Sequence, residues 1–468
     1  MNNTENNTRG TSRLRAWILV GGTTAGLLIT AIVWLNRVGE QAVPHLDNVQ
    51  YMALDEYLLA EGNRFRRRDG SIQLGKVIFP IVPPAQPLPP PDSSGYVGPQ
   101  ECVECHREYY DSFIQTSHFH TSAIATPETV LGHFEPGRNE LKSAHPRLTF
   151  RMLNQNERLV QRVLFTADGV TYSEDFPFDL VIGSGKVGQT YLYWNDQFLF
   201  QMHVSYLTSL DDWINSPGYI DGTADYARPT LAFCLECHTT HAQPVPRTIN
   251  QYRRDSFNLG VTCERCHGPG EEHVAFHRQY PDMPAHGIVN PSNLPRQRAL
   301  EVCQLCHGGL PESMLREPFH FRPGERLDEY YTFHYDAAPG GIHSNSQLPR
   351  LAQSKCFQRS ESMTCIDCHN PHVFERGDFS LFSQRCQHCH SADSCKMHPS
   401  VDLTRLRENC IDCHMPAREM EDIIVMTGAE FRSPPMRDHF IRIAEEQTAR
   451  VLQKWRNDDR PRQGTELP

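Results

Sequence analysis

The most regular pattern that could do chemistry in this sequence is C-x-x-C-H, a pair of cysteines followed directly by a histidine. It occurs seven times and uses fourteen of the 16 cysteines. The copies are CVECH (Cys102, Cys105, His106), CLECH (Cys234, Cys237, His238), CERCH (Cys263, Cys266, His267), CQLCH (Cys303, Cys306, His307), CIDCH (Cys365, Cys368, His369), CQHCH (Cys386, Cys389, His390) and CIDCH (Cys410, Cys413, His414).

The histidine at a fixed place distinguishes this pattern from other uses of paired cysteines. Ligand pairs of a structural zinc site occur at many spacings. A disulfide framework would not repeat one three-residue step, and thiol exchange needs a single pair. C-x-x-C-H is the attachment pattern of a c-type haem, in which both thiols bond the porphyrin and the histidine binds iron. The sequence therefore predicts seven covalently bound haems, each with one motif histidine on its iron.

Two cysteines, Cys356 and Cys395, lie outside every motif. In an exported protein the surroundings are oxidising, so we expect a disulfide between them. Free buried cysteines are the alternative.

The composition limits the class of protein. With 45 Lys and Arg against 56 Asp and Glu, the net charge is −11, which excludes a nucleic-acid binder. A hydrophobic content of 39% together with 34 prolines fits an interior built largely from porphyrin. We expect redox proteins with positively charged docking surfaces as partners.

The N-terminal region contains a candidate membrane anchor. Residues 16–35, "AWILVGGTTAGLLITAIVWL", carry no charge and are long enough to cross a bilayer core of about 30 Å. Arg9, Arg13 and Arg15 precede this stretch, which favours a cytoplasmic N-terminus at residues 1–15. A cleaved signal peptide is the alternative. We therefore expect a single anchor in a bacterial cytoplasmic membrane, with the lipid bilayer as one partner and the haem domain in the periplasm.

The rest of the chain divides by composition. Residues 36–94 form a stalk and a proline-rich linker, with helical spacing over 46–59 and then an extended spacer. Residues 95–146 hold the first haem, and 147–230 are predicted to be an antiparallel β module with a hairpin turn at 194–197. Residues 231–440 hold six haems, and 441–468 form a helix and a tail. The fold class is thus a mostly irregular and α-helical chain wrapped around seven haems, with a small β module and one N-terminal transmembrane helix.

Several stretches resemble a known family. They are "GYVGPQECVECHREYYDSFIQTSHFHTS", "CERCHGPGEEH", "SKCFQRSESMTCIDCHNPH" and "CIDCHMP" followed by "MRDHFI". Together they resemble the multihaem cytochrome c superfamily, which includes hydroxylamine oxidoreductase, its tetrahaem electron acceptor and octahaem tetrathionate reductase. The likeness is greatest to exported forms with a β insertion between the first two haems. The related ammonia-forming nitrite reductases attach their active haem through a motif ending in lysine. All seven motifs here end in histidine, which argues against that reaction.

Further histidines are candidates for the second axial position of each iron. His273 and His277 follow the third motif, and one of them is expected to bind a neighbouring iron, with the iron of the third motif itself as the alternative. His372 and His241 each lie three residues after a motif histidine, too close to fold over the same haem. The resemblance implies distal roles for His118, with His120 as the alternative, and for His439. Weaker candidates are His343 and His398, and a surface position is the alternative for these two and for His241.

These patterns favour a relay of electrons between a quinol-oxidising membrane complex and a periplasmic redox partner. The 24 histidines exceed the seven in motifs by enough to give every iron two histidine ligands. The alternative is an oxidoreductase in which one open haem acts on a small nitrogen or sulfur compound. The sequence identifies no catalytic residue.

Overall fold

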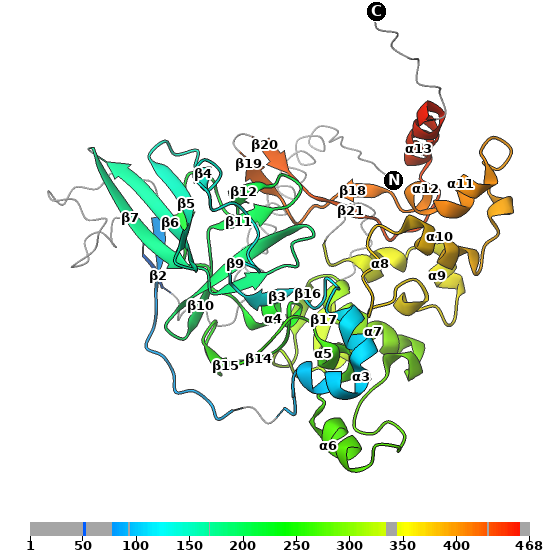
Figure 1. Ribbon diagram of the computed structural model, residues 1–468, viewed down its shortest axis with the longest axis horizontal. Helices are drawn as coiled ribbons and strands as arrows, with labels where there is room; N and C mark the ends of the chain where they lie inside the picture. Colours follow the sequence, from blue (N-terminus) through cyan, green and yellow to red (C-terminus); the bar gives the residue numbers. More distant parts are fainter. Residues whose placement is uncertain are drawn as a thin grey trace, which may run out of the picture. The chain divides into compact units, whose positions relative to one another are not determined.

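The computed structural model (Figure 1) describes residues 50–52, 77–91, 94–167, 169–333, 344–427 and 430–458, all within one unit, Asn48–Pro468. The anchor predicted at residues 16–35 lies outside the described residues. Among the described residues, no helix is both long enough and apolar enough to span a bilayer. Residues 50–52 form the strand β1 (Gln50–Met52), so the helix predicted over 46–59 is wrong at that point.

The first part of the β module is a four-stranded antiparallel sheet in the order β4-β5-β6-β7. Its strands are β4 (Glu140–Lys142), β5 (Leu148–Gln155), β6 (Arg158–Ala167) and β7 (Val170–Pro177). Buried Leu148, Phe150 and Met152 alternate with more exposed residues along β5, as expected for a strand with one face in the core. Asn156 and Glu157 form the turn to β6 with φ of 54° and 69°, the geometry that suits a two-residue hairpin.

A second sheet of six strands has the order β12-β11-β9-β8-β3, with β10 also paired to β9. Its strands are β3 (Ser122–Ile124), β8 (Leu180–Ile182), β9 (Gly188–Asn195), β10 (Phe198–Gln201), β11 (Val204–Leu207) and β12 (Asp212–Asn215). Asn195 pairs with Phe198, so the predicted hairpin turn is present, and Asp196 has a φ of 54° there.

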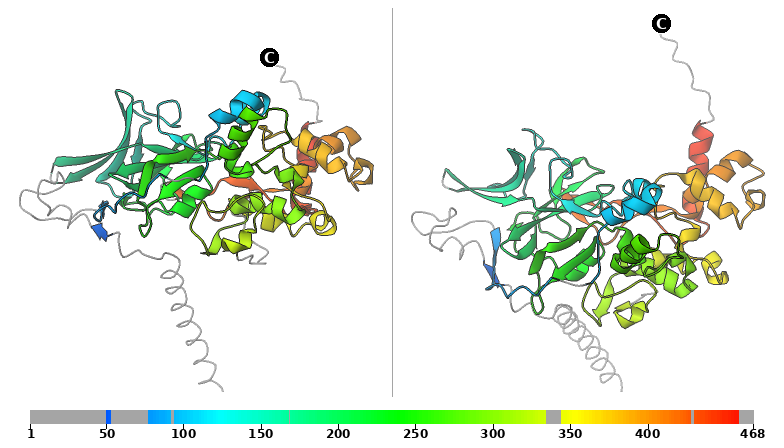
Figure 2. Two further views of the ribbon diagram at one scale, coloured as in Figure 1. Left: turned by 90° about the horizontal axis from the view of Figure 1, so that it is seen from below. Right: turned by 60° about the horizontal axis from the view of Figure 1, so that its bottom comes forward.

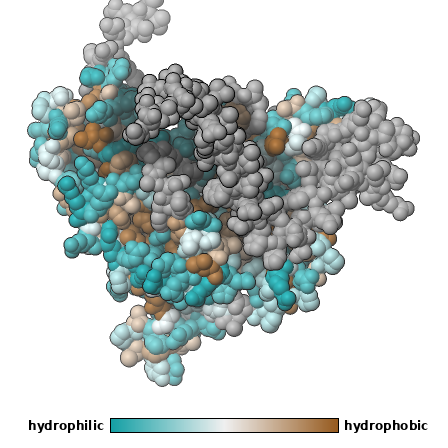
Figure 3. Space-filling view, turned by 180° about the vertical axis from the view of Figure 1, so that it is seen from behind, coloured by the Kyte–Doolittle hydropathy of each residue, from teal (hydrophilic) through white to brown (hydrophobic). Residues whose placement is uncertain are grey.

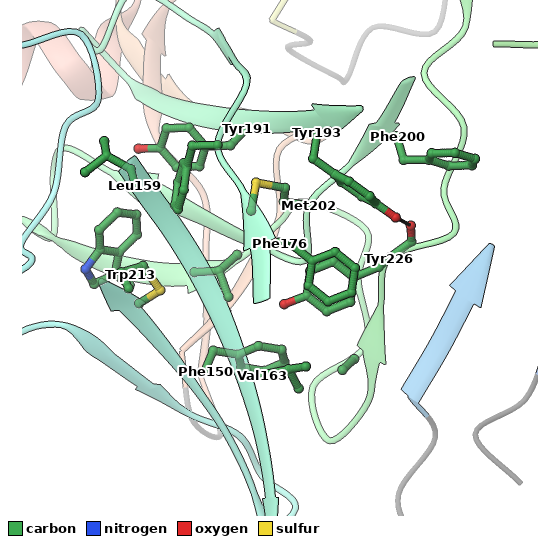
Figure 4. Packing of buried hydrophobic residues seen from close by; sticks show 14 of the residues in the cluster. Phe150, Leu159, Val163, Phe176, Tyr191, Tyr193, Phe200, Met202, Trp213 and Tyr226 are labelled. Atoms are coloured by element: carbon green, nitrogen blue, oxygen red, sulfur yellow. Dashed lines mark hydrogen bonds between the residues drawn. The ribbon is translucent and has the colours of Figure 1, made fainter. Parts of the chain in front are cut away.

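An aromatic cluster fills the interior of the β module (Figure 4). Phe176 stacks on Tyr226 with ring centres 3.6 Å apart, and the Tyr193 hydroxyl donates to the Tyr226 carbonyl at 2.6 Å. His203 is fully buried, stacks on Phe150 at 4.6 Å, and has its Nε2 3.0 Å from the Asn215 side chain. This module therefore has a protein core of its own and needs no porphyrin to fill it.

The haem-motif segments consist of short helices and hairpins. The elements are α3 (Gln100–Phe113), β13 (Ala224–Asp225), α4 (Ala232–Glu236), β14 (Thr239–Pro244), β15 (Tyr252–Leu259), α5 (Cys263–His267), α6 (Glu271–Gln279), η2 (Pro291–Asn293), α7 (Arg296–His307), β16 (Pro311–Met314), η3 (Leu327–Glu329), β17 (Tyr331–Phe333), α8 (Gln347–Leu351), α9 (Lys355–Arg359), η4 (Cys365–Asp367), α10 (Phe379–Gln387), η5 (Ala392–Ser394), α11 (Leu403–Glu408), α12 (Ile411–His414), β18 (Ala417–Glu419), β19 (Val425–Thr427), β20 (Glu430–Arg432), β21 (Pro435–Arg437) and α13 (Glu445–Asp458). Figure 2 shows α9–α12 gathered together, apart from strands β5–β7.

The predicted extent of β structure is wrong. Beyond the module, β14 pairs with β15, β16 with β17, β18 with β21, and β19 with β20. Such hairpins satisfy backbone hydrogen bonds in segments too short for long helices. The C-terminal helix predicted from residue 441 begins at Glu445, and the residues before it are not helical. The described residues visible in Figure 3 are mainly hydrophilic, as expected for a strongly acidic protein.

The proline-rich stretch at residues 82–91, here called the strap, is docked to the protein rather than free. It follows β2 (Val77–Ile81), which pairs in parallel with β13. The Gln86 amide donates to Gln251 Oε1 at 2.9 Å, and Gln251 Nε2 donates back to the Gln86 carbonyl at 2.8 Å. The Pro89 and Pro90 carbonyls accept from Arg253 and Gln243. Because prolines lack an N–H and cannot join a sheet ladder, side chains hold the strap instead.

Gln251→Ala should loosen the strap. The change removes both bonds to the Gln86 backbone, each worth about 0.5–1.5 kcal/mol. Together they contribute about 1–3 kcal/mol, so we expect hydrogen exchange of the Gln86 amide to speed up by roughly fivefold to a hundredfold. Gln358→Ala, which removes a side-chain bond to a carbonyl elsewhere, is the matched control. Unchanged exchange at Gln86 would show that the strap is held by other contacts.

Candidate haem-binding sites

The cysteine pairs are arranged for attachment to one porphyrin each. In several motifs the pair lies on a helical turn, as in α5, which begins at Cys263 and ends at His267. Residues three apart on a helix share one face, so both thiols point to the same side. All 16 cysteines are free, as attachment requires. Among the described residues, no group of three or more His, Cys, Asp or Glu side chains is arranged to hold a bare metal ion.

Histidines that are distant in sequence face one another in four pairs. The ring centres of His106 and His273 are 6.2 Å apart, those of His267 and His372 6.0 Å, those of His118 and His307 6.2 Å, and those of His369 and His439 6.2 Å. Histidine–metal bonds are about 2 Å long, so two imidazoles on opposite sides of one iron have ring centres roughly 6 Å apart. Each pair therefore fits the two axial ligands of one haem iron.

Every pair joins one motif histidine to a histidine from another segment. His273 lies on α6, His118 follows α3, His372 follows η4, and His439 follows β21. The four distal candidates thus face the first, fourth, third and fifth motifs respectively. His273 faces the first motif and His372 the third, so neither pairs with the motif that precedes it. Their role as iron ligands remains a prediction.

Four of the eight paired rings, and His414 as well, are oriented by a hydrogen bond at Nδ1. The acceptors are carbonyl or side-chain amide oxygens, so Nδ1 carries the proton and donates. The bonds run from His267 to the Val289 carbonyl at 2.8 Å, His273 to the His286 carbonyl at 2.8 Å, His307 to Gln347 Oε1 at 3.0 Å, His414 to the Arg442 carbonyl at 3.0 Å and His439 to the Arg437 carbonyl at 3.1 Å. This leaves Nε2 available for iron, the arrangement usual for metal-binding histidine.

Burial keeps these imidazoles neutral. Burial, helped by the neighbouring His307 and His369, lowers the pKa of His118 to about 4. Burial and His369 likewise lower the pKa of His439 to about 4. Burial also lowers the pKa of His267, His307 and His369. A neutral imidazole has the free lone pair that iron requires, so near pH 7 these rings are ready to bind. His203, in the β module, has a similarly low pKa for the same reason, so burial alone does not identify a ligand.

Thiols of different motifs lie side by side. A hydrogen bond with Cys263 raises the pKa of Cys102, which places the first motif beside the third. A hydrogen bond with Cys306 raises the pKa of Cys237, and one with Cys365 raises the pKa of Cys303. The fourth motif is therefore next to both the second and the fifth.

Weaker electrostatic contacts complete the series. Burial and then the nearby Cys306 raise the pKa of Cys266 to about 11, which relates the third motif to the fourth. Burial and then Cys410 and Cys368 raise the pKa of Cys386 to about 12. The motifs thus follow the order first, third, fourth, fifth, sixth, seventh, and the second motif joins at the fourth.

The other sequence candidates are not paired in this way. His241 is buried between Tyr96 and Phe319, with ring centres at 4.7 Å and 5.6 Å. His398 and His120 are exposed, and His343 lies outside the described residues. The His277 ring is 4.6 Å from His273, beside the first haem site. Within the described ranges, no histidine ring faces the motif histidines His238, His390 or His414 across a comparable gap.

The disulfide predicted between Cys356 and Cys395 is wrong, because both thiols are free. Each accompanies a different motif. Burial, Asp367 and then Cys356 raise the pKa of Cys368. Burial and, more weakly, Cys395 raise the pKa of Cys410, against a hydrogen bond with Ser383 that lowers it.

A buried ion pair connects two motifs and was not foreseen from the sequence. Arg265, inside CERCH, has its Nη2 3.0 Å from Oε1 of Glu236, inside CLECH, and both side chains are 3% exposed. The Phe319 amide donates to Glu236 Oε1 at 2.8 Å, and the Tyr331 hydroxyl donates to the same carboxylate. Such pairs fix geometry more than they add net stability. The variable positions of two motifs carry opposite charges, which is the signal that could have indicated this contact.

His118→Ala should expose one iron, whereas His120→Ala should not. The two residues are neighbours in "TSHFH", but only His118 faces a motif histidine. We expect the first variant to gain one high-spin haem that binds carbon monoxide, visible by electron paramagnetic resonance and absorption spectroscopy. The opposite outcome for the two variants would contradict the pairing with His307.

Comparisons with known proteins agree with this chemistry. The family model for cytochrome c554 and c-prime matches residues 202–268, which contain the second and third motifs. The dissimilatory sulfite reductase MccA of Wolinella succinogenes is 20% identical over 391 residues, covering 69% of this chain and 50% of that protein. The chain thus spans about half the length of this curated relative.

Two solved structures are also similar. The outer cell wall cytochrome OcwA has a TM-score of 0.47 and 17% identity, with 76% of this chain and 81% of that chain covered. The undecahaem cytochrome from the S-layer of Carboxydothermus ferrireducens has a TM-score of 0.35 and 15% identity, with 76% and 53% covered. Both TM-scores are below 0.5, so the assignment depends on the motifs and the sequence matches. The repeated C-x-x-C-H motifs, which imply covalently bound haem, and these sequence matches together support the multihaem cytochrome c superfamily as the family of this chain.

Proposed function

We propose that this protein is a heptahaem cytochrome that relays electrons along a series of closely spaced haems. The observation that carries the proposal is the set of four facing histidine pairs, linked to one another by contacts between motif thiols. Haem supplies a one-electron redox centre whose potential depends on its ligands and surroundings.

The fixed ligand pairs support a relay. Rings held at Nδ1 by backbone or amide oxygens keep their position, so the iron's surroundings change little between oxidised and reduced states. His118 and His439 are partly buried, and this burial lowers the pKa of both to about 4, so both rings are neutral near pH 7. Fixed, neutral ligands favour electron transfer over binding of a new molecule at the iron.

The setting of this relay is also part of the proposal. Residues 16–35 would anchor the chain in a bacterial cytoplasmic membrane, with the haem domain in the periplasm. A quinol-oxidising membrane complex would supply electrons, and a periplasmic redox protein would receive them. The charge of −11 favours partners with positive docking surfaces.

The haem number is tested by mass. Protein co-produced with a cytochrome c maturation system should keep seven covalent haems after denaturation, and Cys263→Ala should lose or impair one attachment. If the denatured, unsubstituted protein keeps fewer than seven haems, or contains zinc in their place, the proposal is contradicted.

A second candidate function is favoured by one observation. The His238 ring has a buried Nδ1 with no hydrogen-bond partner, and no histidine among the described residues faces it. Burial lowers its pKa as well. An open iron at this motif would suit an oxidoreductase acting on a small nitrogen or sulfur compound. The matched relative MccA is by name a sulfite reductase, which agrees with a sulfur compound.

Spin state separates the two functions. For a relay we expect the oxidised protein to show low-spin haems and the reduced protein to bind no stoichiometric carbon monoxide. A single high-spin haem that binds carbon monoxide, and that disappears when Cys234 and Cys237 are both changed to Ala, would favour the enzyme.

A further inference from the structure

A buried carboxylate adjoins one of the distal histidines. Asp438, immediately before His439, has a side chain that is 0% exposed. Arg350 of α8 binds it with two bonds, Nε to Oδ1 at 2.9 Å and Nη2 to Oδ2 at 2.8 Å. Arg442 Nη1 lies 2.7 Å from the same Oδ2. Arg418 Nη1 lies 3.8 Å from that oxygen as well. Three guanidinium groups thus surround a single carboxylate next to the fifth haem site.

This cluster fixes the backbone on both sides of His439. Asp438 Oδ1 accepts from the Phe440 amide at 3.0 Å, and the Asp438 amide donates to the Pro416 carbonyl at 3.0 Å. The Ser354 hydroxyl donates to the His439 carbonyl at 3.2 Å and accepts from the Ile441 amide at 2.8 Å. A residue outside any helix or strand is therefore held as firmly as one within a regular element.

The charges of the cluster must also act on the iron. His369 and His439 face each other, so the iron they would share is bound by the residue directly after Asp438, and Arg442 Nη1 lies 2.7 Å from the Asp438 carboxylate. In a poorly solvated site, a nearby positive charge favours the reduced iron and a nearby negative charge favours the oxidised iron. Three guanidinium groups, of Arg350, Arg418 and Arg442, surround one carboxylate, so the net positive charge of the cluster favours the reduced iron.

We propose that Asp438 is a positioning residue, whose carboxylate, held by Arg350 and Arg442, fixes the segment carrying His439 and sets the potential of the haem between His369 and His439. This inference depends on the proposed ligation by His439. Arg350 and Arg442 hold the carboxylate in place, and the net charge of this cluster sets the reduction potential of the iron.

The test uses the full-length holoprotein and two variants, one that removes a negative charge and one that removes a positive charge. Asp438→Asn removes a negative charge, so one haem should become easier to reduce. We expect its reduction equilibrium constant to increase by up to about tenfold, which is a rise in potential of about 59 mV for one electron. Arg442→Gln removes a positive charge, so the same haem should become harder to reduce. Arg442 is 30% exposed, so this variant is the better tolerated of the two and keeps the test open if the first misfolds.

Two further variants make the result specific. Asp175→Asn breaks a similar two-bond pair with Arg162, at 2.6 and 2.8 Å, in the β module, and should shift no haem. His439→Met should raise the potential of one haem well above the others, because His–Met ligation does so, and it marks the haem to follow. Potentiometric titration with electron paramagnetic resonance measures all four variants.

The possible failures are distinguishable. If His439→Met alters no haem, the proposed ligation is wrong and the inference fails with it. If that variant shifts one haem but Asp438→Asn and Arg442→Gln move it in the same direction, or not at all, the ligation stands and the electrostatic role is overturned. A purely structural cluster would give that second result.

Discussion

Two histidines that are to hold one iron must approach it from both sides with ring centres about 6 Å apart, and the four facing pairs each join histidines of different segments. This constraint explains the organisation of the motif segments. Residues near 106 must meet residues near 273, those near 118 must meet 307, and those near 369 must meet 439. Helices long enough to be stable alone would carry these histidines past one another. Short helices and two-stranded hairpins instead bring each segment back within a few residues.

The β module is stabilised in a different way. Its two sheets enclose Phe150, Tyr191, Trp213 and Tyr226, all at most 2% exposed. The β module therefore buries enough apolar surface to form a core from its own side chains. The motif segments have few comparable clusters of buried residues, such as the small one around Leu327 and Tyr331. They gain their interior from what the thiols and histidines bind, so cofactor attachment and folding are one process there.

The features that could be predicted from the sequence are those determined by residues close together in the chain. The cysteine spacing, the histidine after each pair and the hairpin at Asp196 depend on residues a few positions apart. The pairing of His118 with His307 spans 189 positions and leaves no periodic signal, so only the tertiary structure reveals it. The disulfide failed for the same reason, because sequence cannot show that two thiols are close. The sequence predicts a free spacer at the strap because the side chains that donate to its carbonyls, Gln243 of β14 and Arg253 of β15, lie far along the chain.

The fourth motif is where the electronic properties of several sites are coupled. Its Cys306 lies beside Cys237 of the second motif and affects Cys266 of the third. The Glu236–Arg265 pair is buried at the same junction and is neutral as a whole. A charge added or removed there would be poorly screened and would act on three haem sites together. The sixth motif differs, since His390 and the nearby His398 are exposed to water. In the proposed relay, the protein interior would therefore set the potentials at the junction, whereas water would act on the potential at the exposed sixth motif.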